Sequence, residues 1–171
     1  MFGPSTLLVA QMEVPASETM TVIRRVRDRG GRSLLNFAPA LSISLDLLQD
    51  VDFVVANEGE AAALGKDPAS IAARLRRGLV VTRGAAGAMA YPAGGAAFAV
   101  PALSIVPVDT TGAGDTFVGV LAAALDGNAP LETALRRASA AAGLACLARG
   151  AQTAMPDAAA IEAATARLPT V

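Results

Sequence analysis

The chain has 171 residues, and its 53% hydrophobic and 17% charged residues are typical of a globular protein with a buried core. The formal net charge of -1 argues against nucleic-acid and membrane partners, because both require a basic surface. The absence of histidine excludes Ser-His-Asp and Cys-His catalysis and histidine-bound zinc. Cys146 is the one cysteine, so an intrachain disulfide is excluded, and no apolar run reaches the roughly twenty residues that span a bilayer. We therefore expect a cytoplasmic protein whose acid–base chemistry falls mainly to carboxylates.

The first half of the chain alternates between strand and helix patterns. Short apolar runs predict strands at Thr6–Ala10, Ser33–Phe37, Asp52–Ala56 and Gly78–Thr82. Helical spacing and capping residues predict helices at 15–29, at Leu45–Leu48, at Glu58–Leu64 after an Asn57 cap, and at Asp67–Arg77. Buried strands separated by helices are typical of a mostly parallel sheet that is covered on both faces.

The second half of the chain changes character. Gly87–Tyr91 and Ala96–Val100 flank a Pro-Ala-Gly-Gly turn and predict a hairpin, and Leu103–Val108 has a strand-like pattern. Helices are predicted at Ala113–Leu125, Leu131–Ala148 and Pro156–Arg167. Because no linker divides the chain, we expect residues 1–171 to form one α/β domain.

The strongest chemical signal is the segment Asp109–Asp115. A strand-like run leads into the small-residue turn Gly112–Gly114, and a helix follows at once, so its free N–H groups face the turn. That arrangement suits a phosphate, and Asp115 beside it can accept a proton from a hydroxyl nucleophile. The spacing alone fits an N-capping aspartate after a glycine turn equally well.

The segment lacks the Walker A pattern, but it resembles the Asp-Thr-x-Gly-Ala-Gly-Asp signature of the ribokinase family of carbohydrate kinases, also called the phosphofructokinase B family. The resemblance implies that Asp115 is the catalytic base, in contact with the sugar hydroxyl and with ATP. It also implies that the backbone N–H groups of Gly112, Ala113 and Gly114 form an anion hole, with Gly114 contacting ATP.

Two further segments resemble motifs of that family in the expected order. Asn57-Glu58-Gly59-Glu60 resembles its Asn-x-x-Glu motif, which implies that Asn57 helps to bind ATP and that Glu60 holds Mg²⁺ through water. A plain capping box is an equally good interpretation of this segment alone. A Thr-x-Gly-x-x-Gly nucleotide loop is implied at Thr82, Arg83, Gly84, Ala85, Ala86 and Gly87, although such a loop alone is more often a turn.

Gly150-Ala151-Gln152 resembles the family's stretch beneath its adenine and monovalent-cation sites, and Ser139 falls at a position near adenine. The resemblance implies K⁺ beside the anion hole. Its implied ligands are the Asp109 carboxylate and the carbonyls of Thr111, Ala145, Ala148 and Gly150. Ala154 falls where ribokinases can offer a serine hydroxyl, so one ligand is missing.

The N-terminal part resembles the ribokinases within the family more narrowly. Gln11–Pro15 and Asn36–Ala40 carry this likeness, which implies that Glu13 lies near the sugar. An acidic residue just before a helix is also favoured by the helix dipole, so Glu13 has a purely structural interpretation too.

Taken together, the resemblance implies a ribokinase-like three-layer α/β/α fold with a mostly parallel sheet, from which the N-terminal strands and the lid are missing. The implied activity is phosphoryl transfer from Mg-ATP to a sugar hydroxyl, D-ribose giving ribose 5-phosphate. The alternatives are a fructokinase or another sugar or nucleoside kinase, a non-catalytic nucleotide-binding remnant, and a structural fragment. The expected partners are ATP, a small sugar, and either a second copy of the full-length form or a separate chain that supplies the missing half.

Overall fold

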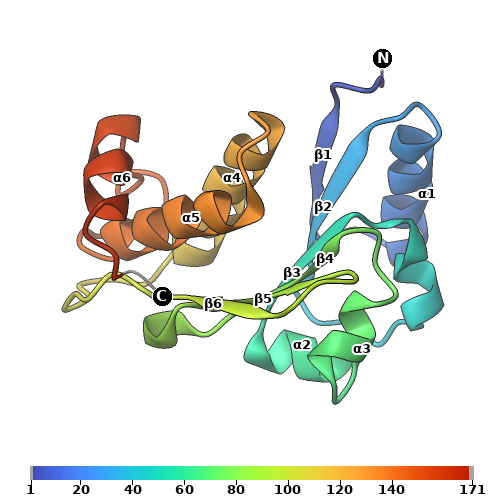
Figure 1. Ribbon diagram of the computed structural model, residues 1–171, viewed down its shortest axis with the longest axis horizontal. Coiled ribbons are helices and arrows are strands. Elements are labelled where there is room, and N and C mark those ends of the chain that lie inside the picture. The colour runs from blue at the N-terminus through green and yellow to red at the C-terminus, as the bar shows by residue number, and fades with distance from the viewer. Residues whose placement is uncertain (1, 170–171) are drawn as a thin grey trace. The chain divides into compact units, whose positions relative to one another are not determined.

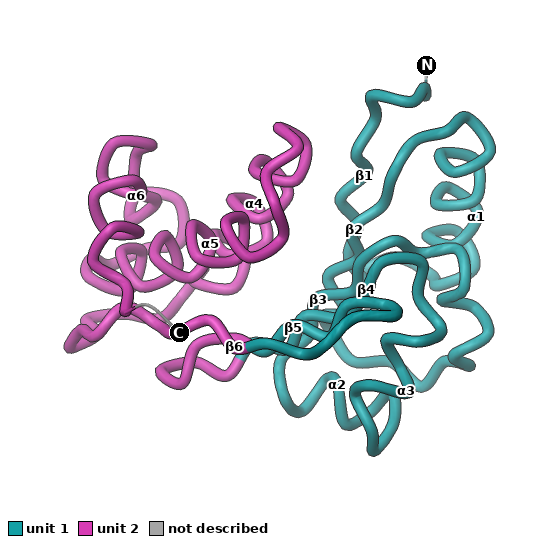
Figure 2. The backbone as a smooth tube through the Cα atoms, viewed as in Figure 1, with its two compact units in different colours: residues 1–82, 89–98 teal, residues 83–88, 99–171 magenta. Residues whose placement is uncertain are grey.

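The computed structural model describes residues 2–169, which form two compact units (Figure 2). The first unit contains the residues up to 82 together with 89–98. The second contains 83–88 and the residues from 99 onward. None of the helices in residues 2–169 is long and apolar enough to cross a bilayer.

Strands and helices alternate in the first unit, as predicted (Figure 1). Its first elements are β1 (Leu7–Ala10), α1 (Ala16–Arg27), β2 (Arg32–Asn36), the 3₁₀ helix η1 (Leu45–Asp50), β3 (Phe53–Asn57), α2 (Glu58–Leu64), α3 (Pro68–Ala72) and β4 (Gly78–Thr82). The 3₁₀ turn η2 (Gly84–Ala86) and the strands β5 (Ala88–Pro92) and β6 (Phe98–Val100) follow. The remaining helices are α4 (Ala113–Asp126), α5 (Leu131–Ala145) and α6 (Ala158–Thr165).

The six strands form one sheet in the order β1-β2-β3-β4-β5-β6. Strands β1 to β4 are mutually parallel. The N–H of Ala93 donates to the Arg77 carbonyl at 2.8 Å, and the N–H of Arg83 donates to the Gly87 carbonyl at 2.8 Å, so β5 runs back along β4. The predicted α/β fold with a mostly parallel sheet is therefore confirmed.

One face of the parallel strands carries the core of the first unit. Helix α1 packs against β1 and β2, α2 packs against β3 and β4, and α3 packs against β4 (Figure 1). The strands contribute alternate side chains to this core, namely Leu35, Val54, Ala56, Leu79 and Val81. Because the helices offer apolar residues at helical spacing, as with Met20 and Ile23 of α1, both surfaces lose water when they meet.

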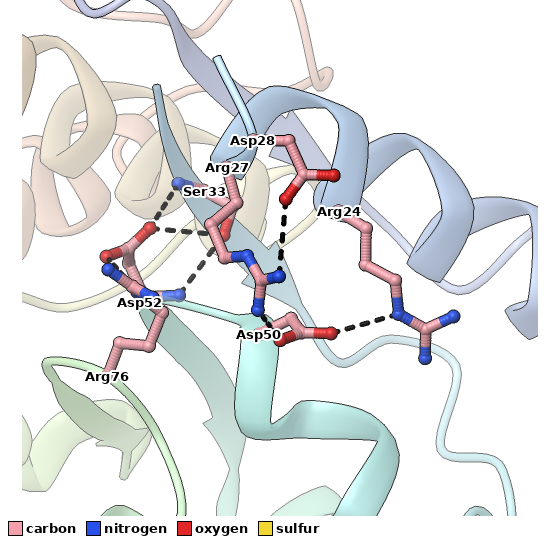
Figure 3. A network of polar contacts seen from close by, with 7 residues as sticks. All are labelled: Arg24, Arg27, Asp28, Ser33, Asp50, Asp52 and Arg76. Carbon is pink, nitrogen blue, oxygen red and sulfur yellow. Dashed lines mark hydrogen bonds and ion pairs between the residues drawn. The ribbon is translucent and has the colours of Figure 1, made fainter. Parts of the chain in front are cut away.

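A buried carboxylate, Asp52, joins three segments at the amino ends of β2 and β3 (Figure 3). Its Oδ2 accepts a hydrogen bond from the Ser33 N–H at 2.9 Å, and its own N–H donates to the Ser33 Oγ at 3.1 Å. Its Oδ1 lies 3.4 Å from Nε of Arg76 and 3.5 Å from Nε of Arg77. Asp52 therefore fixes the start of β2 against β3 and holds the segment that enters β4.

The neighbouring carboxylate, Asp50, attaches α1 in the same way (Figure 3). It is buried at the end of η1 and accepts from Nε of Arg24 at 2.9 Å and from Nη1 of Arg27. Arg24 and Arg27 of α1 thus point toward η1 and pair with this acid, which holds the helix against η1.

Two predicted elements are wrong. Leu103–Val108 is not a strand. Its backbone does not pair with a strand; instead, the Val108 N–H donates to the carbonyl of Cys146, at the end of α5, at 2.8 Å. The helix predicted at Asp67–Arg77 ends at Ala72. The N–H groups of Arg76 and Arg77 bond instead to the carbonyls of Val51 and Asp52, just before β3, at 3.0 and 2.9 Å, which directs the chain into β4.

Replacing Asp52 by alanine should lower the free energy of unfolding by about 2–4 kcal/mol, because it leaves a buried N–H of Ser33 and two arginines without their acceptor. Asp46→Ala is the matched control. Its pair with Arg74 is short, 2.7 Å, but both side chains are exposed, so the loss should stay below about 1 kcal/mol. Urea denaturation of the two variants measures the difference, and equal losses would contradict the assigned role of Asp52.

Candidate functional site

The segment Asp109–Asp115 forms a tight turn followed by a helix. Gly112 has the left-handed conformation, with φ of 75°, and precedes the first residue of α4. The N–H of Ala113 donates to the Thr110 carbonyl at 3.2 Å, and the N–H of Thr116 donates to the Gly112 carbonyl at 2.9 Å, which starts the helix. Asp115 lies exposed in the first turn of α4, where the helix dipole favours a negative charge.

Gly112 is required by space as well as by conformation. A Cβ on Gly112 would lie 2.9 Å from both Cα and Cβ of Ala151. The turn therefore packs directly on the backbone of the 150–152 segment. The sequence motif includes Ala151, but its steric contact with Gly112 was not predicted, since nothing in an alanine signals it.

Asp109 connects the same two segments through its carboxylate. Its Oδ1 accepts from the Thr111 N–H at 2.9 Å, and its Oδ2 accepts from the Gly150 N–H at 3.1 Å. The N–H groups of Val108 and Asp109 both donate to the Cys146 carbonyl, at 2.8 and 3.2 Å. The structure thus brings together Asp109, Thr111 and Gly150, which the sequence placed in one cation site.

These contacts change two pKa values. Hydrogen bonds from the Thr111 side chain, the Thr111 N–H and the Gly150 N–H lower the pKa of Asp109. Burial, and then the Asp109 charge, raise the pKa of the Cys146 thiol. Asp109 is therefore ionised at neutral pH, and Cys146 stays a protonated, weakly reactive thiol.

The anion hole that the sequence predicts can be compared with the main-chain donors around the turn. The N–H groups of Gly112 and Gly114 have no acceptor within residues 2–169. Ala113 differs from its two neighbours, because its N–H already donates to Thr110. Two of the three predicted anion-hole amides are thus available to a bound oxyanion at the positive end of α4.

In the first unit, Asn57 and Glu60 form a complete capping box at the carboxyl end of β3. Asn57 Oδ1 accepts from the Glu60 N–H at 2.9 Å, and Glu60 Oε2 accepts from the Asn57 N–H at 2.7 Å. Thr82, at the end of β4, lies directly opposite Asn57 in the sheet register. Glu60 is half-buried, and its other oxygen has no hydrogen-bond partner in the described part of the chain. The box explains these residues structurally and leaves one carboxylate oxygen for a hydrated cation.

The predicted nucleotide loop is a 3₁₀ turn between β4 and β5. Gly84 has φ of 54° and open space around it, whereas a Cβ on Gly87 would lie 2.0 Å from the Val100 carbonyl oxygen. Gly87 is therefore fixed by the close approach of β6. Nε of Arg83 is buried without a hydrogen-bond partner, and Nη2 bonds only to the Ala86 carbonyl, at 3.3 Å, so this guanidinium retains unused donors within residues 2–169.

The other predicted site residues have these positions. Glu13 is exposed in the bend after β1, and the Met12 N–H beside it donates at 3.0 Å to Ala38, in the segment that follows β2. Ser139 is buried in α5, where its Oγ donates to the Pro101 carbonyl at 2.7 Å. Ala145 ends α5, Ala148 lies exposed in the loop that follows, and Ala154 is buried. The Ser139 contact gives that residue a structural role, and its place near adenine stays a prediction.

Residues 5–158 match a family described as pfkB family carbohydrate kinase. Bacillus subtilis ribokinase is 33% identical to the chain over 152 residues, which are 88% of this chain and 52% of the relative. Schizosaccharomyces pombe ribokinase is 30% identical over 165 residues, 88% of this chain and 52% of the relative. The structure of Arabidopsis thaliana ribokinase complexed with ribose and ATP superimposes with a TM-score of 0.85 at 27% identity, covering 93% of this chain and 55% of that one.

The chain belongs to the pfkB family of carbohydrate kinases. It spans about half the length of the curated relatives that it matches.

Gly112→Ala should destabilise the second unit by at least about 2 kcal/mol, because a left-handed non-glycine residue costs roughly 1–2 kcal/mol and the new methyl overlaps Ala151. Gly119→Ala is the matched control, since this glycine lies within α4 with open space around it. That change should stabilise the helix by up to about 1 kcal/mol. Thermal unfolding of both variants measures the effects, and a Gly112→Ala protein as stable as the parent would refute the packing described.

The Asp109 contacts should persist down to low pH. A carboxylate with a lowered pKa adds stability that is fully present above the unfolded pKa, about 3.9, and is lost as the pH falls through the folded value. The amide proton shifts of Thr111 and Gly150 should therefore titrate together below about pH 4. In Asp109→Asn the two shifts should be independent of pH, and a persisting titration would assign the effect to another group.

Proposed function

We propose that this chain carries the phosphoryl-transfer half of an ATP-dependent sugar kinase, with D-ribose as the acceptor and ribose 5-phosphate as the product. The observation that carries the proposal is the geometry at Gly112–Asp115. The N–H groups of the left-handed Gly112 and of Gly114 are unused at the positive end of α4, and the Asp115 carboxylate stands in the first turn beside them. Phosphoryl transfer to a hydroxyl group requires hydrogen-bond donors that stabilise the phosphoryl charge and a base that accepts the hydroxyl proton.

In the proposed reaction, Asp115 accepts the proton of the sugar hydroxyl. The hydroxyl oxygen then forms a bond to the γ-phosphorus of ATP as the bond to the β–γ bridging oxygen breaks, and ADP leaves with that oxygen. The N–H groups of Gly112 and Gly114 stabilise the charge on the transferring phosphoryl oxygens.

Two cations fit the residues present. Glu60 offers a carboxylate oxygen without a hydrogen-bond partner within the described residues. Mg²⁺ is commonly held by one or two carboxylates through water and by substrate phosphates, so Mg²⁺ here would neutralise phosphate charge. K⁺ would be held by Asp109 and neighbouring carbonyls, and it would add positive charge beside the anion site. The contact between Asp109 and Gly150 supports this neighbourhood, whereas the Gly150 carbonyl already accepts from Ala154 at 3.3 Å.

The proposed ATP contacts outside the anion site are Arg83, Asn57 and Thr82. The proposed location of the enzyme is the cytoplasm. Support comes from the unused donors of Arg83 and from the position of Asn57 and Thr82 at the carboxyl ends of adjacent parallel strands, where α/β sheets bind ligands. Ribose is the proposed acceptor because the two quoted curated relatives are ribokinases and the Arabidopsis structure contains ribose. Fructose and nucleosides are the alternative acceptors within the family.

A second candidate is a nucleotide-binding protein that does not transfer phosphate. The observation that favours it is length, because the chain spans about half of its curated relatives. Such a protein would bind Mg-ATP through the same residues and would release no ADP when a sugar is added. A complete enzyme would need the remaining part of the fold from another polypeptide or from a longer form of the chain.

The test combines binding and turnover. Calorimetry with Mg-ATP should show saturable binding to the chain, and a coupled assay should show ADP release with ribose in excess over fructose. Asp115→Asn should bind Mg-ATP as the parent does and should lower the rate by about 100-fold or more, because it removes the proton acceptor. Glu132→Gln is the control, since Glu132 is also an exposed acid in the first turn of a helix, α5, but that helix follows Pro130 and not a left-handed glycine.

The outcomes separate the candidates. Binding without ADP release favours the nucleotide-binding protein. An absence of both binding and thermal shift with Mg-ATP contradicts the kinase and the binding protein together. An Asp115→Asn protein as fast as the parent shows that another group accepts the proton.

A further inference from the structure

The hydroxyl of Thr116, one residue after the proposed base Asp115, is buried without a hydrogen-bond partner within residues 2–169. The residue is 5% exposed and is the fourth of α4. A threonine in a helix commonly satisfies its hydroxyl with the carbonyl three or four residues earlier. Thr21 of α1 and Thr165 of α6 do so, and each donates to the carbonyl four residues earlier, at 2.8 and 2.7 Å. Thr116 therefore lacks a bond that its place in a helix offers.

The Thr116 side chain lies over the turn that forms the candidate anion site. Helical side chains lean toward the N-terminus of their helix, so the fourth residue of α4 covers the first residues of that helix. The carbonyls three and four residues earlier are those of Ala113 and Gly112, and the Gly112 carbonyl already accepts from the Thr116 N–H at 2.9 Å. The Ala113 carbonyl belongs to the same peptide group as the Gly114 N–H, which has no acceptor within the described residues.

We propose that Thr116 is a positioning residue of the anion site, whose hydroxyl turns to donate to the Ala113 carbonyl when an oxyanion binds the Gly114 N–H. An anion on that N–H polarises the peptide group, which makes the carbonyl at its other end a stronger acceptor. The new hydrogen bond in turn makes the N–H a stronger donor to the anion. A rotation of Thr116 about χ1 can bring about this change, since threonine has two accessible rotamers in a helix. The inference rests on the proposed phosphoryl-transfer function and adds to it a residue that does not touch the ligand.

The unpaired hydroxyl links anion binding to the stability of the chain. A buried hydroxyl without a partner destabilises the ligand-free chain, and this penalty is removed when the bond to Ala113 forms. The anion therefore binds to a state that has one more hydrogen bond than the free chain, and the difference in free energy appears as affinity. Removing the hydroxyl should consequently leave the free chain as stable as before, or more stable, while it weakens anion binding.

The test compares two substitutions of Thr116. Thr116→Val keeps the shape of the side chain and removes the hydroxyl. Its melting temperature without ligand should equal or exceed that of the parent, whereas calorimetry should show Mg-ATP binding weakened about three- to tenfold, as expected for one ordinary hydrogen bond. Thr116→Ser keeps the hydroxyl and should bind Mg-ATP as the parent does.

Thr19→Val is the matched control. Thr19 is also the fourth residue of its helix, α1, and it is also 5% exposed. Its hydroxyl is likewise buried without a partner in the part of the chain that the structure describes. No glycine turn precedes α1, because its N-cap is Pro15. Thr19→Val should therefore match Thr116→Val in stability and leave the affinity for Mg-ATP unchanged.

Inorganic phosphate is a second probe, since it tests the anion site without the rest of the nucleotide. Its binding should move the amide proton shift of Gly114 downfield. The change should be smaller in Thr116→Val, because the peptide group between Ala113 and Gly114 is then less polarised. A residue with a merely structural role would leave this change as it is in the parent.

The outcomes are decisive for Thr116. A Thr116→Val protein that binds Mg-ATP as tightly as the parent overturns the proposal, and so does a Thr116→Ser protein that binds as weakly as the valine variant. A lower melting temperature in Thr116→Val, not shared by Thr19→Val, also overturns it, since the hydroxyl would then be paired in the ligand-free chain. A parent that binds neither Mg-ATP nor phosphate contradicts the proposed kinase half as well, whereas binding that Thr116→Val leaves unchanged contradicts this inference alone.

Discussion

The first unit depends on one buried carboxylate, Asp52. It accepts from the main chain of β2, and it pairs with the two arginines that lead into β4, so three segments distant in sequence share one acceptor. The parallel register of β2, β3 and β4 starts from this point. Because the register is set at the amino ends of the strands, it also decides which residues meet at their carboxyl ends. Asn57 and Thr82 are adjacent at the carboxyl ends of β3 and β4, where we propose that the nucleotide binds. This adjacency follows from the contact that Asp52 makes at the amino ends of the strands.

Asp109 has a comparable part in the second unit, where a carboxylate again joins two loops through main-chain N–H groups. The packing of Gly112 on Ala151 adds a steric condition to this polar one. Few side chains in the turn contribute chemistry of their own, apart from Asp115. The site is built mainly of backbone groups held in position, as anion sites at helix N-termini commonly are. The geometry of the candidate anion site thus depends on how closely the 109–115 turn approaches the 150–152 segment.

The sequence predicted Glu58–Leu64 and Gly78–Thr82 to the residue, since a capping motif and glycines mark their ends. The Asn57–Glu60 box was predicted as one of two alternatives, and it forms. Leu103–Val108 was predicted as a strand from its apolar pattern. The prediction failed because such a pattern carries no information on whether a partner strand exists. The contacts of Asp52 could not be predicted for a related reason, because its partners are an N–H group and arginines far along the chain. The family resemblance grouped Asp109 with Thr111 and Gly150, but as cation ligands and not as hydrogen-bond partners. Of the candidate site, the motif residues could be predicted from spacing, but the carbonyl of Cys146 and the backbone of Ala151 could not, because every residue has those atoms.

The two glycines of the loop after β4, Gly84 and Gly87, are subject to different constraints. This difference decides which of them the fold itself requires. Gly84 is held only by its backbone conformation, with open space around it, whereas Gly87 has no room for any side chain against Val100. Under the proposed function, a variant that no longer bound ATP would still need Gly87 to fold, whereas a substitution at Gly84 would meet only the strain of its left-handed backbone. Gly87 is therefore required by the hairpin whatever the loop binds, and within this loop the proposed nucleotide contact concerns Gly84 and Arg83.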